Sequence, residues 1–187
     1  MRLVFIDTET TGLSPLRGHR IIEIAGVEMV DGRITGREFH RLINPRRSVP
    51  QEAVDIHGID DAMLQGKPTF DEVLMDLIPF LAGGRTVMHN APFDTAFFDA
   101  ELAPMGLRVP GLSTSDVVID SLPRFRKLHP GLPCSLTALC ERYGLLPQGD
   151  ESRHGALTDA RMLARLWVAT SSELFLPDAF DRPCRLA

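Results

Sequence analysis

The chain is poor in the features that mark secreted or membrane-spanning proteins. It has 3 cysteines in 187 residues, and Cys134, Cys140 and Cys184 form no C-x-x-C pair, so neither a zinc site nor a disulfide framework is indicated. No apolar run approaches the roughly 18 residues that a membrane span needs, and the N-terminal run is too short for a signal peptide. We therefore expect a cytoplasmic protein without a membrane anchor.

An excess of positive charge is also missing. The chain carries 20 Lys and Arg against 25 Asp and Glu, a formal net charge of −5. This balance argues against a protein that holds nucleic acid by bulk positive potential. A metal-dependent nuclease escapes the objection, because clustered acids hold cations that in turn face the phosphates. The length and the 44% hydrophobic content fit one globular domain.

Two acidic residues follow the first apolar run of the chain. Residues 3–6 are large and apolar, which favours a strand buried on both faces. If the strand continues, the i, i+2 spacing puts Asp7 and Glu9 on one face near its carboxyl end. Two such carboxylates repel each other unless a cation is present, and Mg²⁺ or Mn²⁺ prefers oxygen ligands of this kind. An isolated D-x-E pair more often only adds solubility, so the assignment depends on later segments.

Alternating patterns along the rest of the chain predict an α/β domain. Further strands are expected at residues 20–30, 33–43, 86–88 and 117–119. Helices are expected at residues 69–81, from about 92, at 136–143 and at 156–170. A loop at residues 46–50 should lead to residues 56–59. This order implies a mixed five-stranded sheet, with three antiparallel and then two parallel strands, flanked by helices.

Two later segments bring further acids to the same edge of the predicted sheet. Residues 89–94, with the sequence HNAPFD, follow the strand at residues 86–88, and His154 and Asp159 lie where the last helix begins. In open α/β sheets, ligands bind outside the carboxyl ends of the strands. We interpret His89 and Asn90 as a polar pair that anchors the loop to Asp94. On the helix that begins near Pro92, the expected core-facing residues are Phe93, Ala96, Phe97 and Ala100.

Taken together, residues 7–12, 89–94 and 154–159 resemble, in order and spacing, the three motifs of the DEDDh-type 3′→5′ exonucleases. The resemblance extends over about residues 1–170. It implies an RNase H-like fold. It also implies two divalent cations, Mg²⁺ or Mn²⁺, bridged by Asp7 and held by four residues: Asp7, Glu9, Asp94 and Asp159.

The chemistry of phosphodiester hydrolysis calls for the same arrangement. In-line attack by water needs one ion to lower the pKa of the water and another to stabilise the departing 3′ oxygen, with the ions about 3.5–4 Å apart. His154 is the candidate general base, because an imidazole with an ordinary pKa of about 6.5 accepts a proton near neutral pH. The alternative interpretation is that His154 is only a surface histidine in the loop that enters the last helix.

The resemblance also implies a pocket for the terminal nucleotide. The backbone of the chain around residues 8–13 is expected to line this pocket, and His57 is expected to approach the nucleotide. A basic segment with Arg124, Arg126 and Lys127 either contacts phosphates or forms a solvated helix face. The expected nucleotide-binding residues are Thr8, Thr10, Thr11, Gly12, Leu13 and His57.

The expected function is a metal-dependent 3′→5′ exonuclease that releases nucleotide 5′-monophosphates from single-stranded DNA in proofreading or repair. Two alternatives stay open: an exoribonuclease that trims RNA 3′ ends, and a non-catalytic module that binds DNA ends or a polymerase. We expect an exonuclease domain over residues 1–171 and a short tail over 172–187. Residues 172–175 faintly resemble a sliding-clamp peptide without its glutamine, so the candidate protein partners are a DNA polymerase subunit and a sliding clamp.

Overall fold

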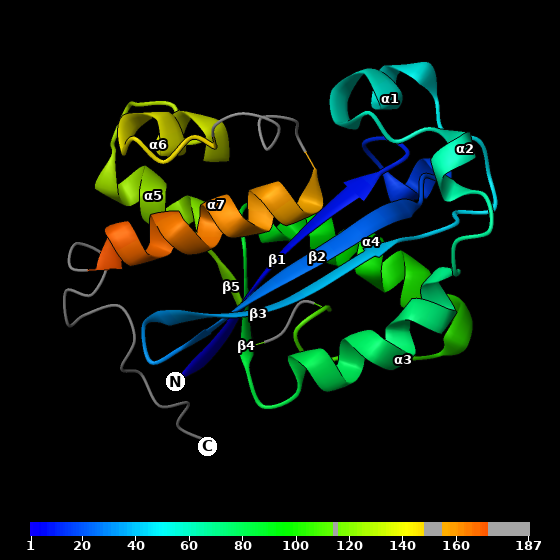
Figure 1. Cartoon of the computed structure of the whole chain (residues 1–187), viewed down its shortest axis with the longest axis horizontal. Helices are drawn as coiled ribbons and strands as arrows, with labels where there is room; N and C mark the ends of the chain where they lie inside the picture. The colour runs from blue at the N-terminus through cyan, green and yellow to red at the C-terminus, as the bar shows by residue number, and fades with distance from the viewer. Residues whose placement is uncertain (114–115, 148–154, 172–187) are drawn as a thin grey trace.

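The fold is built on a twisted five-stranded sheet (Figure 1). The computed structural model describes residues 1–113, 116–147 and 155–171. The strand order is β3-β2-β1-β4-β5; the first three strands pair antiparallel, and β4 and β5 run parallel to β1. The predicted mixed sheet is therefore confirmed. The strands are β1 (Arg2–Thr10), β2 (Ile21–Val30), β3 (Arg33–Leu42), β4 (Arg85–Met88) and β5 (Val118–Asp120).

Helices cover both faces of the sheet (Figure 1). The α-helices are α1 (Gln51–His57), α2 (Asp61–Leu64), α3 (Phe70–Leu81), α4 (Ala91–Leu102), α5 (Leu122–Leu128), α6 (Leu136–Arg142) and α7 (Ala156–Ala169). Two short 3₁₀ helices are η1 (Pro15–Arg17) and η2 (Ala103–Met105). The predicted capping box at the start of α3 is present, since the Thr69 N–H donates to Glu72 Oε2 at 2.7 Å. Among the described residues, no helix combines the length and apolarity needed to cross a bilayer.

The central strand β1 sends alternate side chains into two separate cores. Leu3 and Phe5 join the core under α5, α6 and α7, where the rings of Phe5 and Trp167 meet edge to face with centroids 5.9 Å apart. Val4 and Ile6 join the core under α3 and α4. Because side chains alternate between the two faces along a strand, this pattern also determines on which face of the sheet the next residues of β1 lie. Asp7 and Glu9 therefore share the α7 face.

The carboxyl end of β1 extends beyond its pairing with β4. Strand β1 pairs with β4 only at Leu3–Phe5, whereas it pairs with β2 along its whole length. The polypeptide of β4 then turns away at Asn90, whose φ of 73° is left-handed, and enters α4. The last residues of β1 thus lie beside the first turn of α4, which carries Asp94.

Two local expectations were wrong. Residues 51–57 form helix α1, for which a loop was expected; its outward-facing Ile56 breaks the pattern of an amphipathic helix. On α4, Ala96 and Ala100 are exposed, while Asp94 and Phe98 are buried. Phe97 is buried as expected and Phe93 packs partly against the core, so the apolar spacing was wrong only for Ala96 and Ala100, because polar residues fill part of the buried face.

Candidate active site

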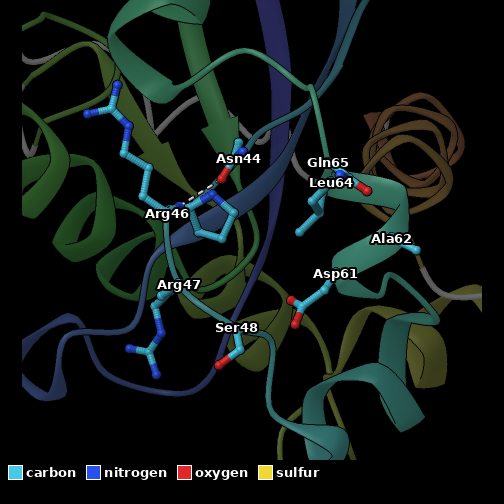
Figure 2. A pocket seen from close by; sticks show the side chains of 9 residues that line it. Asn44, Arg46, Arg47, Ser48, Asp61, Ala62, Leu64 and Gln65 are labelled. Atoms are coloured by element: carbon cyan, nitrogen blue, oxygen red, sulfur yellow. Dashed lines mark hydrogen bonds between the residues drawn. The ribbon is translucent and has the colours of Figure 1, made fainter.

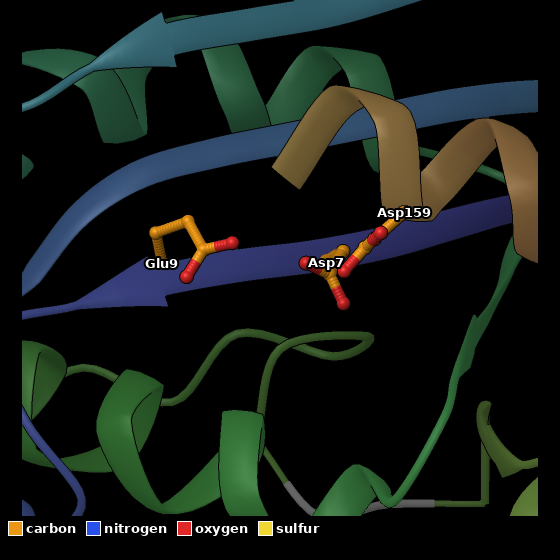
Figure 3. A group of neighbouring side chains, drawn as sticks. All are labelled: Asp7, Glu9 and Asp159. Atoms are coloured by element: carbon orange, nitrogen blue, oxygen red, sulfur yellow. The ribbon is translucent and has the colours of Figure 1, made fainter. Parts of the chain in front are cut away.

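Three of the predicted ligands converge although the sequence separates them by about 150 positions. Asp7 and Glu9 project from one face of β1, and Asp159 reaches them from the first turn of α7 (Figure 3). One carboxylate oxygen from each residue lies within 4.8 Å of the others. The alternation of β1 and the packing of α7 on the same face produce this meeting. The predicted convergence of Asp7 and Asp159 is confirmed.

Asp94 approaches the same place from the other side of β1. It lies in the first turn of α4, is 4% exposed, and accepts a hydrogen bond of 2.7 Å from Thr8 Oγ1 to its Oδ1. After burial, the charge of Asp94 is the largest contribution to the raised pKa of Asp7. Thr8 thus links the fourth carboxylate to the strand that carries the first two.

Burial and mutual repulsion make these carboxylates hard to ionise. Burial raises the pKa of Asp7 well above its usual value, and the charges of Asp94, Asp159 and Glu9 add to this effect. Burial also raises the pKa of Glu9 to about 8, again with repulsion from neighbouring acids. The pKa of Asp94 is raised to about 7, mainly by burial. A compensating positive charge is what would let all of them ionise at neutral pH.

The donor set suits hard divalent cations. All of its side-chain donors are carboxylate oxygens, which Mg²⁺ and Mn²⁺ prefer. Their separation allows shared ligation, and their raised pKa values show that cations would relieve a repulsion already present in the fold. The residues present therefore fit the divalent cations that the sequence predicted.

A cavity adjoins the acids at Glu9. It has a volume of about 700 Å³ and lies between the end of β1, the loop leading to η1, and α1. All six predicted nucleotide-binding residues line it: Thr8, Thr10, Thr11, Gly12, Leu13 and His57. Leu13 is 83% exposed and presents an apolar side chain at the rim. The cavity thus adjoins the acid cluster through Glu9 and has apolar groups among its lining residues.

Phe93 and Ile56 are among the lining groups of this cavity that the sequence analysis did not assign to it. The half-buried Phe93 ring packs against the core as expected and also lines the cavity. Ile56 lines it from α1 and is 66% exposed. An aromatic residue directly before the acid of the second motif was the available signal for Phe93. No sequence signal pointed to Ile56, because α1 itself was not predicted.

His57 occupies the last turn of α1 and faces the same cavity. Its Nδ1 accepts a hydrogen bond of 3.0 Å from the Ile59 N–H, so Nε2 is the protonated nitrogen of the neutral ring. Burial lowers the pKa of His57 and favours this neutral form. The ring is therefore fixed in orientation by the glycine-containing turn that ends α1.

Glu23 is a further acid at the site that the sequence analysis did not single out. It lies on β2 directly opposite Glu9, and it is buried. Its charge contributes to the raised pKa of both Asp7 and Glu9. A glutamate inside an otherwise apolar strand was the available signal, but only the strand register places it beside Glu9.

His89 and Arg124, the latter from the basic segment, both make contacts within the fold. His89 Nδ1 contacts Ser121 Oγ at 2.8 Å and Nε2 contacts the Cys134 carbonyl oxygen at 2.8 Å, so His89 anchors the loop as predicted. The guanidinium of Arg124 lies over the Trp167 ring at 5.6 Å. This contact makes Arg124 part of the fold, while the neighbouring cations of α5 remain at the surface.

His154 lies outside the described residues, so its predicted role stays a prediction. The same holds for residues 172–187.

A second cavity, of about 450 Å³, lies between the loop after β3 and α2 (Figure 2). Arg46 and Arg47 line one side and Asp61 the other. The loop is stabilised locally, since the Arg46 N–H donates to Asn44 Oδ1 at 2.9 Å and the Val49 N–H to Asp61 Oδ1 at 2.8 Å. None of the predicted site residues lines this cavity.

The fold is that of the RNase H-like nucleases, and the acid cluster has the donor set that divalent cations prefer. A family model described as Exonuclease matches residues 4–167. The chain therefore belongs to the exonuclease family, and within it to the DEDDh-type 3′→5′ exonucleases, as the three motifs predicted.

Curated relatives agree with this assignment. The chain is 43% identical over 169 residues to the DNA polymerase III subunit epsilon of Rickettsia typhi. This match covers 90% of this chain and 73% of that protein. It is 42% identical over 172 residues to the subunit of the same name from Escherichia coli, covering 90% of this chain and 70% of the relative.

Solved structures give the same picture. Exonuclease X in complex with 5′ overhanging duplex DNA superimposes with a TM-score of 0.68 at 31% identity, covering 91% of this chain and 92% of the other. The nuclease domain of 3′hExo, a DEDDh family member bound to rAMP, has a TM-score of 0.77 at 20% identity, with 92% of each chain covered. The second likeness shows that the fold is shared.

Proposed function

We propose that this exonuclease removes nucleotide 5′-monophosphates one at a time from the 3′ end of single-stranded DNA, in proofreading or repair. The observation that carries the proposal is the meeting of Asp7, Glu9 and Asp159 beside a cavity that Glu9 also lines. Two divalent cations, when bound to these carboxylates and Asp94, would supply Lewis-acid chemistry for the attacking water and the leaving 3′ oxygen.

The side chains of the site would divide the remaining work. Glu9 belongs both to the acid cluster and to the lining of the cavity. A terminal nucleotide seated in the cavity would therefore have its phosphodiester beside the carboxylates. Thr8 would keep Asp94 oriented toward β1 through its hydroxyl hydrogen bond. His154 would accept the proton of the attacking water; its motif position supports this role.

The cavity supports a single-stranded end as the substrate. The Leu13 and Ile56 side chains and the Phe93 ring offer apolar contacts that an unpaired base can use irrespective of its identity. The neutral His57 ring would form part of the wall against which the nucleotide packs. A base held in a duplex would have to leave its partner to reach these groups.

The polarity of degradation tests the proposal directly. A single strand carrying a fluorophore at its 5′ end and the same strand labelled at its 3′ end are incubated with the protein and Mg²⁺. We expect a ladder of shortened strands that keep the 5′ label, immediate release of the 3′ label as a mononucleotide, and no cleavage with chelator. Release of the 5′ label as a mononucleotide would contradict the proposal.

The choice between DNA and RNA is tested in the same assay. Matched DNA and RNA oligomers are compared by kcat/KM with Mg²⁺ and with Mn²⁺. We expect DNA to be the better substrate. A clear preference for RNA would replace the DNA proposal by the exoribonuclease alternative, because the pocket must then accept the 2′-hydroxyl.

The role of His154 has its own test. We expect His154→Ala to lower kcat by about 10²–10⁴, the usual contribution of a general base, while Mn²⁺ affinity and thermal stability stay near wild type. His129, whose Nε2 contacts Tyr143 Oη at 3.0 Å, serves as a control for general effects of histidine removal. Wild-type kcat in His154→Ala would remove His154 from the mechanism.

We also propose the setting in which the enzyme works. The free thiols of Cys134 and Cys140 support a reducing cytoplasm. The names of the curated relatives support a DNA polymerase subunit as the protein partner. The extent of the family match supports residues 1–171 as the exonuclease domain, with residues 172–187 as a tail.

A further inference from the structure

Helix α7, which brings Asp159 to the acid cluster, begins without a capping side chain of its own. Its N-cap residue is Gly155, in an extended conformation with φ −176° and ψ 147°, and a glycine has no side chain to accept a hydrogen bond from the first turn. A helix start that is buried needs such an acceptor from elsewhere. Ala156, the first residue of α7, is fully buried.

The acceptor comes from the sheet. Glu23 Oε2 on β2 accepts a hydrogen bond of 2.8 Å from the Ala156 N–H, across 133 positions of sequence. The contact joins an anionic carboxylate to the positive end of a helix, which is the favourable orientation. Glu23 thus supplies from another element the cap that Gly155 lacks.

The second oxygen of Glu23 is also held. His40 on β3 contacts Glu23 Oε1 through Nε2 at 2.6 Å. Glu23 is only 6% exposed, and both of its oxygens have protein partners. This separates Glu23 from its cross-strand neighbour Glu9, which belongs to the ligand cluster. Glu23 is placed to hold the helix, and its oxygens are not directed to a cation.

We infer that Glu23 is a positioning residue for Asp159: it fixes the start of α7, and His40 holds Glu23 in place. The inference rests on the proposed role of Asp159 as a metal ligand. Asp159 lies one helical turn from the contact, and its own N–H makes a first-turn bond of 3.0 Å to the Gly155 carbonyl oxygen. A shift or fraying of this turn would therefore move the Asp159 carboxylate relative to Asp7 and Glu9.

The same helix offers a matched control. Arg161, farther along α7, forms a two-pronged ion pair with Glu38 on β3, with contacts of 2.8 and 2.7 Å. This pair also ties α7 to the β2–β3 hairpin, but it lies at the surface and includes neither the helix start nor an acid of the cluster. Glu38→Gln therefore weakens this tether of α7, leaving Arg161 one acceptor oxygen instead of two, without touching the cap.

The test compares variants by direct Mn²⁺ binding to the whole protein without DNA, measured from the electron paramagnetic resonance signal of free Mn²⁺. Glu23→Ala removes the acceptor, and we expect the Kd for Mn²⁺ to rise at least tenfold, in line with the 10–100-fold effect of removing partners that orient metal ligands. Glu23→Gln keeps an oxygen for the Ala156 N–H, and we expect its Kd within threefold of wild type. Glu38→Gln should bind Mn²⁺ as wild type does.

These variants separate positioning from charge and from simple stability. If Glu23 acted only through its negative charge, Glu23→Gln would weaken Mn²⁺ binding as much as Glu23→Ala. If Glu23 only stabilised the fold, Glu23→Ala would lower the Tm and leave the Kd for Mn²⁺ unchanged. Either result would overturn the inference. A wild-type protein that binds no Mn²⁺ would overturn the proposed metal site as well.

A second-site variant keeps the test decisive if Glu23→Ala folds poorly. In Glu23→Ala/Gly155→Ser, the serine supplies a cap from within the helix, since serine is among the best N-cap residues and the extended φ of residue 155 suits any side chain. A Cβ at position 155 has its nearest contact at 3.6 Å, from the Glu23 oxygen that this variant removes. We expect the double variant to recover Mn²⁺ affinity. If it recovers folding but not Mn²⁺ affinity, or if it recovers neither, the inference is contradicted.

Discussion

Partly or fully buried acids occupy two regions of the sheet, and their surroundings are opposite. At one end, Asp7 and Glu9 face other carboxylates, and burial with repulsion raises their pKa values. Toward the other end of β2, Glu28 accepts hydrogen bonds from Thr35 Oγ1 at 2.8 Å, Arg2 Nε at 2.8 Å and Arg37 Nη1 at 3.0 Å. These partners, led by Thr35, hold the pKa of Glu28 below its usual value.

The difference shows which acids serve the fold and which act against it. Arg2 also donates to the carbonyl oxygens of Leu81 and Ala82, so the pair with Glu28 ties the sheet to the end of α3. The acids around Asp7 raise the free energy of the folded, metal-free state, because charged groups are gathered there out of water. Such strain is expected at functional sites, where stability is exchanged for activity.

The largest expected effect comes from neutralising the cluster at its centre. We expect Asp7→Asn to lower kcat by at least about a hundredfold, since even the outer partners of metal ligands are worth 10–100-fold. Because a buried, repelled carboxylate is removed, the Tm of the metal-free protein at pH 8 should rise. Single-turnover kinetics and thermal melts with chelator measure the two effects.

Glu28→Gln is the matched change in the paired region, and the expected signs are reversed. Activity should stay within twofold of wild type, while the Tm falls by about 2–4 °C for each kcal/mol lost in a chain of this size. A Tm loss in Asp7→Asn together with a large activity loss in Glu28→Gln would remove the distinction between the two regions.

A smaller effect is expected in the pH dependence of stability. For Glu9 the pKa is raised to about 8 in the folded state, above its unfolded value, so the folded protein binds more protons between those values. Stability of the metal-free protein therefore falls as pH rises through this window. Burial lowers the pKa of His57 and of His89, which gives the opposite slope near pH 6.5, so the decline is cleanest above pH 7.

Thermal melts with chelator at pH 7.0 and 8.5 should show this decline. The Tm should fall by about 2–4 °C for each kcal/mol of unfolding free energy that is lost. Glu9→Gln should reduce the slope without abolishing it, because the pKa values of Asp7 and Asp94 are also raised. Glu28→Gln should leave the slope unchanged, because the pKa of Glu28 is lowered and the group stays ionised. A wild-type slope in Glu9→Gln would show that the decline has another source.

The same contrast explains what the sequence could predict. Strand alternation was enough to place Asp7 and Glu9 on one face, and the motif order brought in Asp94 and Asp159. The role of Glu23 could not be predicted, because it depends on the register that sets Glu23 opposite Glu9 and on the packing of α7.

Helices with polar residues on their buried face were also misjudged. On α4, the buried set includes Asp94, Thr95 and Glu101, so hydrophobic spacing found Phe97 but wrongly added Ala96 and Ala100. Glu101 is buried because its carboxylate pairs with Arg20 through contacts of 2.7 and 2.5 Å. Helix α1 is short and presents Ile56 to the cavity, so its role as a pocket wall left no amphipathic pattern to recognise.

The smallest expected effects extend the contrast to cations on α5. Arg124 is half-buried against Trp167, whereas Arg126 and Lys127 are exposed. We expect Arg124→Ala to lower the Tm through lost packing and to leave KM for DNA unchanged.

Arg126→Ala should raise KM for DNA about two- to threefold at low salt. This effect should disappear at high salt, because exposed charges are screened. Arg126 also lines a surface cavity with His89 and Asn90, next to the loop that carries Asp94, so it is the cation of α5 best placed to meet a passing phosphate. Measuring KM at two salt concentrations for both variants distinguishes a phosphate contact from a solvated helix face: equal KM values for Arg126→Ala and wild type at low salt would assign the exposed charges to solubility.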